Sequence, residues 1–175
     1  MRLSSPINGC LQIVKWPLGL TMILFLPGAV LGLRDILRAV AHNPAPFWPL
    51  VAGLAGYVVA WRLVLGKRWA GSAFSTLEHE LTHALFALLT FHPVVGIRAT
   101  WSRGGHTQFR GSGNWLIFLS PYFFPTISVF LVALQLVVPE SAATGLSAAI
   151  GASIGYHIIS TWRETHPGQS DFEKA

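Results

Sequence analysis

Long apolar runs alternate with short polar stretches along most of the chain. The runs cover residues 16–33, 47–65, 70–91, 114–138 and 142–162. A helix needs about 20 apolar residues to cross the hydrocarbon core of a bilayer, and each run is close to that length. The pattern predicts an all-α membrane protein, a bundle of about five transmembrane helices.

Between the third and fourth runs, the hydrophobic period changes from helical to alternating. Apolar side chains alternate with Gly, Arg, Thr and Ser over residues 95–102, and an extended pattern resumes over residues 106–110. Alternation of this kind, interrupted by Gly104 and Gly105, is typical of a β-hairpin. We therefore expect a short β-hairpin between the third and fourth transmembrane helices. It is either a solvated interfacial loop or an exposed strand edge to which a substrate backbone adds.

Small residues and prolines predict how these helices pack and bend. Gly53 in the second run and Gly151 in the fifth allow two helices to approach closely within a bilayer. Pro121 and Pro125 in the fourth run predict a kink, because proline interrupts helical hydrogen bonding. Residues 34–46 carry charged residues and an Asn-Pro pair, so we expect a polar loop there.

Composition agrees with a membrane protein. Of all residues, 52% are hydrophobic and 11% charged, whereas soluble domains carry about a quarter charged residues. Because no linker or repeat divides residues 1–175, we interpret them as one integral membrane domain. The net charge of +5 favours contact with anionic lipid of the bilayer over binding of nucleic acid. The excess of Lys and Arg in the hairpin and the carboxyl-terminal tail predicts that both are cytoplasmic.

The third run contains the motif His79-Glu80-Leu81-Thr82-His83. Two histidines four positions apart project from one face of a helix, at the spacing that lets both bind one zinc ion. In a chain of this composition a chance HExxH has an expectation on the order of one per cent. Ionisable groups in an apolar segment also indicate function, since they are costly there without partners. The motif predicts a hydrolytic Zn²⁺ site with Glu80 as the general base.

A catalytic zinc site has three protein ligands, so His79 and His83 leave one to be found. Cys10 is the only cysteine, which excludes cysteine-based zinc sites and internal disulfides. We favour Asp171, because it follows the last helix among turn-forming residues that let the tail fold back. The alternatives that the sequence leaves open are His157, Glu164, His166 and His106.

Three motifs follow one another in a fixed order: the HExxH sequence, Gly104-Gly105-His106-Thr107 in the hairpin, and Leu119-Ser120-Pro121-Tyr122 in the next helix. Together they resemble the site-2 protease family of intramembrane zinc metallopeptidases. The resemblance covers roughly residues 79–138. It implies that the two motif histidines and an aspartate on a later helix bind Zn²⁺. It also implies that Glu80 is the base and that the hairpin docks the substrate.

The hairpin residues that would bind the substrate are Thr100, Gly104, Gly105, His106 and Gln108. Thr100 and Gln108 are the positions we expect to face outward. The chain departs from the family pattern because no Asn-Pro-Asp-Gly or Leu-Asp-Gly step occurs on the later helix. Asp171 is the candidate replacement for the aspartate of that step.

The leading hypothesis is an intramembrane zinc metalloprotease that hydrolyses peptide bonds of transmembrane protein or peptide substrates. The motif lies near the middle of the third run, so we expect the metal below the membrane surface. The alternative is a non-catalytic membrane protein that binds a metal or a partner helix through a relic HExxH site. The prenyl-protein proteases fit less well, because they generally carry a large additional domain that residues 1–175 do not include.

Overall fold

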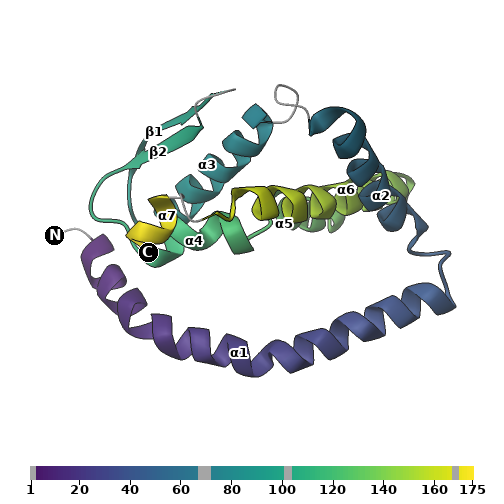
Figure 1. Ribbon diagram of the computed structural model, residues 1–175, viewed down its shortest axis with the longest axis horizontal. Helices are drawn as coiled ribbons and strands as arrows, with labels where there is room; N and C mark the ends of the chain where they lie inside the picture. The colour runs from purple at the N-terminus through teal and green to yellow at the C-terminus, as the bar shows by residue number, and fades with distance from the viewer. Residues whose placement is uncertain (1–2, 67–71, 101–103, 167–169) are drawn as a thin grey trace.

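The computed structural model describes residues 3–66, 72–100, 104–166 and 170–175, and it is mainly helical (Figure 1). Helix α1 runs along one side of the molecule, while the other elements gather opposite it. In chain order the elements are α1 (Ser4–His42), α2 (Trp48–Ala60), the π-helical segment η1 (Trp61–Leu65), α3 (Ser72–Leu89), β1 (Val94–Ala99), β2 (Gly105–Phe109), α4 (Trp115–Phe123), α5 (Thr126–Gln135), α6 (Glu140–Glu164) and α7 (Ser170–Lys174).

Within the described residues, three helices are long and apolar enough to cross a membrane: α1, α2 continued by η1, and α6. The pair α4 and α5 passes the same test together but is bent by 70°, as in a broken span or a re-entrant loop. Helix α3 is not among the candidates, because its His and Glu residues lower its mean hydropathy. By length and composition, the described residues thus contain three candidate membrane helices, or four with the bent pair, whereas the sequence predicts five. A fifth span through α3 stays a prediction.

Helix α1 is longer than the apolar run that predicts it. The helix continues to His42, so the prediction of a polar loop over residues 34–46 is wrong for most of that stretch. Arg34 donates two hydrogen bonds to Asp35, and neither residue breaks a helix. The helix ends where Asn43 precedes Pro44, since a residue before proline disfavours the helical conformation.

Helices α2 and α6 pack closely through their glycines. A Cβ atom at Gly53 would collide with the backbone oxygen of Ala148, and one at Gly151 would collide with the backbone oxygen of Leu50. These contacts confirm the prediction that small residues let the two helices approach closely.

The two strands form an antiparallel sheet that contacts α3. Ile97 pairs with Thr107 and Ala99 pairs with Gly105, with an irregularity near the start of β1. Residues 101–103 lie outside the described residues, but Gly104, one of the two glycines expected to interrupt the strands, has the positive φ of +73° that favours glycine. The sheet, α3 and α4 meet around the buried residues Phe86, Ala87 and Ile117.

Candidate functional site

The HExxH residues lie on one buried face of α3. His79, Glu80 and His83 are each less than a tenth exposed. The helical repeat brings His83 one turn beyond His79, and their rings meet edge to face with centroids 4.7 Å apart. Two imidazoles therefore point toward the same place.

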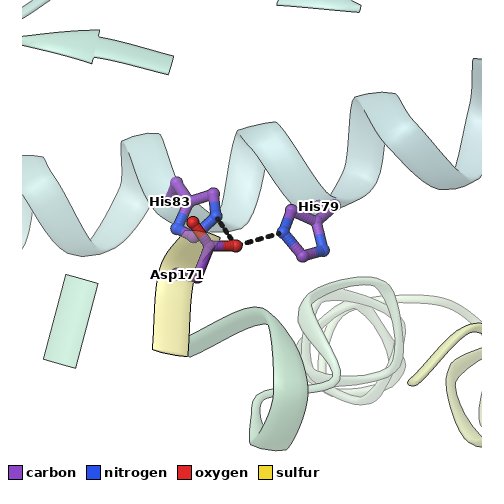
Figure 2. Close-up of side chains that lie close together, drawn as sticks. All are labelled: His79, His83 and Asp171. Carbon is purple, nitrogen blue, oxygen red and sulfur yellow. Dashed lines mark hydrogen bonds and ion pairs between the residues drawn. The ribbon is translucent and has the colours of Figure 1, made fainter. Parts of the chain in front are cut away.

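Asp171 approaches these histidines from α7, the short helix after α6. Its Oδ2 lies 3.4 Å from Nε2 of His79 and 3.5 Å from Nε2 of His83. Figure 2 shows both rings of α3 directed at the carboxylate on α7. One ligand atom from each residue lies within 4.8 Å of the other two, and among the described residues this is the group of three that could hold a metal ion.

The ring of His83 is oriented by a backbone carbonyl that proline leaves without its helical partner. In a regular helix the carbonyl of Ile117 would accept from the N–H four residues on, but that residue is Pro121, which has none. Nδ1–H of His83 donates to this carbonyl over 2.8 Å. Because a carbonyl can only accept, Nδ1 carries the hydrogen, and Nε2 keeps its lone pair toward Asp171.

The ring of His79 is oriented by a carboxylate at the end of α6. Its Nδ1 lies 2.7 Å from Oε2 of Glu164. The hydroxyl of Ser75 donates to Oε1 of Glu164 over 2.5 Å, and that of Ser160 does so over 3.1 Å. Glu164 thus accepts from three donors, and Nε2 of His79 is the nitrogen left for Asp171.

This donor set fits zinc. A tetrahedral zinc ion with bonds of about 2.0–2.1 Å would separate its ligand atoms by about 3.3 Å. The Oδ2 of Asp171 lies 3.4 and 3.5 Å from the two Nε2 atoms. Three electron-pair donors that converge in this way repel one another unless a cation or a proton lies between them. Two nitrogens and one carboxylate oxygen are also ligands that catalytic zinc uses.

Asp171 is held in its ionised form. Burial by itself raises the pKa of this carboxyl, but the contacts with His79 and His83 outweigh burial and hold its pKa well below the usual range. The hydroxyl of Tyr122 donates a further hydrogen bond to Oδ2 over 3.1 Å, and the ring of Tyr122 contacts that of Phe172. These contacts from α4 fix the carboxylate of α7 against α3.

Glu80 contacts strand β2. The hydroxyl of Thr107 donates to Oε2 of Glu80 over 2.7 Å and to the backbone oxygen of Glu80 over 2.8 Å. At Gly105 a Cβ atom would come within 2.6 Å of both Glu80 and Thr76. Glycine is therefore required where the strand meets the motif helix.

A cavity of about 780 Å³ opens over this face of α3. All of β2 lines it, so four of the five predicted substrate-binding residues, Gly104, Gly105, His106 and Gln108, reach its wall. Thr100 lies instead at the end of β1, where its N–H and hydroxyl both donate to the backbone oxygen of Gly104.

The two edges of β2 can be told apart from their backbone hydrogen bonds. The N–H of Arg110 donates to Pro93, so it points toward β1. Because backbone direction alternates along a strand, the N–H of Gln108 points toward β1 as well. The groups of Gly105, Thr107 and Phe109 point to the other edge. The expectation that the backbone of Gln108 faces outward is therefore corrected, since it pairs with β1.

The other candidate third ligands lie elsewhere. His157 is half-buried on α6 and His166 is exposed beyond its end. His106 lines the cavity, and Glu164 contacts the far nitrogen of His79, but neither belongs to the convergent group.

Sequence reasoning missed the partners of the motif residues. Pro121 was a usable signal, because a proline frees the carbonyl four residues before it. Strand alternation was another, since it places Thr107 on the face opposite to His106 and Gln108.

A comparison with models of protein families finds one match. The model of the family described as Peptidase M50B-like matches residues 50–163. The matched stretch includes His79, Glu80 and His83 and ends before Glu164 and Asp171. No curated protein and no solved structure matches the chain.

Proposed function

Because the chain belongs to the Peptidase M50B-like family, we propose that it is a zinc metalloprotease that hydrolyses peptide bonds of membrane-protein substrates. His79, His83 and Asp171 would hold the metal, and Glu80 would be the general base. One observation carries the proposal: ligand atoms of these three residues converge within 4.8 Å on the wall of a cavity that Glu80 also lines.

The chain's own part is to hold and protect this arrangement. When bound, zinc would supply Lewis-acid chemistry for the attack of water on a peptide carbonyl. Ile117 and Glu164 keep the two Nε2 atoms turned inward, and Tyr122 steadies the carboxylate of Asp171. Both histidines are buried, and both line the cavity.

Glu80 can move a proton at one of its oxygens. Thr107 occupies Oε2, so Oε1 is the atom that would take a proton from the attacking water. The same oxygen would return the proton to the leaving amine. Held by Thr107, the carboxylate need not change rotamer between these two steps.

The outer edge of β2 would bind the substrate. An extended peptide could pair with the backbone groups of Gly105, Thr107 and Phe109, which point away from β1. It would then run along the cavity beside Glu80. The bias of Lys and Arg supports a cytoplasmic position for the sheet and the tail.

The test compares the wild-type chain with Glu80→Gln. Zinc is measured in both purified proteins, and membranes of cells that express each are searched for new peptide N-termini by mass spectrometry. We expect about one zinc per chain in both, and new N-termini in membrane proteins with the wild type alone. Identical N-termini in the two, or a wild type without zinc, would contradict the proposal. Zinc in both without new N-termini would favour a non-catalytic metal-binding protein.

A further inference from the structure

Two apolar helices, α1 and α6, each indicate how deep the site lies in the bilayer. We infer that the metal site lies at the membrane boundary, so that its substrates are membrane-anchored chains cut in their juxtamembrane segments. This inference rests on the proposed function and narrows its substrate class. It places the metal at the boundary, whereas the sequence predicts a metal below the membrane surface.

Helix α1 marks both boundaries of the apolar layer. Between Lys15 and Arg34 it carries no charged residue, and that stretch of 18 residues would be about 27 Å long at 1.5 Å per residue. The hydrocarbon core is about 30 Å thick. None of the best apolar window of α1 is buried in the protein, so lipid is its natural surrounding. Lys15 and Arg34 thus lie near the two interfaces.

The part of the molecule that carries the metal site contacts α1 over the N-terminal segment of that helix, through hydrogen bonds between side chain and backbone at Asn8, Leu11 and Lys15. The side chain of Asn8 donates to the backbone oxygen of Ser112, and the indole of Trp115 donates to that of Leu11. Lys15 itself donates to the backbone oxygen of Ala175, next to α7. In Figure 1 the N-terminal end of α1 and helix α7 lie at the same end of the molecule. Helix α7, which carries Asp171, is therefore level with the boundary rather than with the middle of α1.

Helix α6 gives the same level independently. It has no charged residue between Glu140 and Arg163, and it is itself a candidate membrane span. Glu164, the residue after Arg163, is the one that contacts His79 over 2.7 Å. His79 therefore contacts the last residue of α6, just beyond the apolar part of that helix. This places His79 near the membrane boundary as well.

The surroundings of the site agree with this level. The cavity wall includes Lys174, His106 and Gln108, and charged groups are costly in hydrocarbon but not at the interface. Helix α3, which carries the motif, is also not apolar enough to count as a span.

A site at the boundary changes what the substrate must do. A peptide bond just outside an apolar segment is already near water, so it can become extended without breaking helical hydrogen bonds inside the bilayer. The edge of β2 would then bind a juxtamembrane strand, while the apolar segment of the substrate stays in lipid. A bond at mid-bilayer would not reach the cavity.

The test uses cysteine labelling in lipid nanodiscs, where both membrane faces meet solvent. Cys10 is exposed and lies before Lys15, so the wild-type chain reports the boundary directly. Glu173→Cys on α7 reports the site, and Leu24→Cys reports mid-bilayer on lipid-exposed α1. Both are made with Cys10→Ser, and zinc content verifies each protein.

With a charged maleimide, we expect Cys10 and Glu173→Cys to react at least about tenfold faster than Leu24→Cys, because a charged reagent is excluded from hydrocarbon. A slow reaction at Glu173→Cys or at Cys10, equal to that of Leu24→Cys, would overturn the inference. Labelling needs no proteolysis, so its result is separate from that of the Glu80→Gln comparison. In that comparison, cleaved bonds should lie within about two helical turns of the apolar boundary; bonds at mid-segment would overturn the inference while leaving the protease proposal intact.

Discussion

Helices α3 and α1 use their side chains in opposite ways. On α3 the ionisable residues are buried and have partners on β2, α4, α6 and α7. On α1 the apolar residues are exposed, and its polar links are confined to its first turns. Lipid alone can cover α1, but only specific partners make buried imidazoles and carboxylates tolerable. The contrast predicts that equal substitutions should have large effects around α3 and small ones on lipid-facing surfaces.

The largest difference in zinc affinity between a site variant and its control on α1 should follow removal of the Asp171 carboxylate. Asp171→Ala removes one of three proposed ligands, so zinc affinity should fall by more than about 100-fold, beyond the loss typical of outer-shell partners. Asp35→Ala on α1 is the matched control, because Asp35 is exposed beside Arg34, and it should leave affinity unchanged. Competition with a chromophoric chelator measures both. Loss of zinc in His157→Ala instead would move the third ligand to α6.

A smaller difference should follow loss of charge at Glu164. Glu164→Gln keeps an oxygen near Nδ1 of His79 but removes the negative charge that holds the ring, so zinc affinity should fall about 10- to 100-fold. Glu140→Gln, at the exposed far end of α6, should have no effect. The same chelator competition measures both. Complete loss of zinc would make Glu164 a ligand, and no loss would remove its orienting role.

The smallest expected difference is one in kcat, between a Thr107 variant and its control on α1. Thr107→Val removes the hydroxyl that holds Oε2 of Glu80, and loss of a hydrogen bond to a charged group should lower kcat about 10-fold. Zinc content should stay intact, because no ligand changes. Thr21→Val on α1 also removes a hydroxyl, one that donates to the backbone oxygen of Pro17, and its kcat should equal that of the wild type. Equal rates for both variants would show that Thr107 does not orient the base.

Local pattern was enough for much of the fold. The apolar runs predicted α1, α2 and α6, and period-two alternation predicted the strands. The boundary of α1 was missed because the charged residues Arg34, Asp35 and Arg38 favoured a loop, yet they form a helix that continues to His42. Charged residues alone do not end a helix. Within the described residues, α1, α2 with η1, α6 and the bent pair α4 and α5 are the candidate spans. The fifth predicted span, through α3, stays a prediction, because the His and Glu residues of the motif lower the hydropathy of that helix.

The sequence by itself determined that His79 and His83 share a helix face, because residues four positions apart lie about one turn apart on the same side of a helix. Only the tertiary structure decided which side chain approaches the two histidines, since Asp171 lies 92 residues from His79 along the chain. The same holds for Glu164, 85 residues away. Helical periodicity carries no information over such separations, and these contacts depend on how α6 ends and how α7 packs on α4.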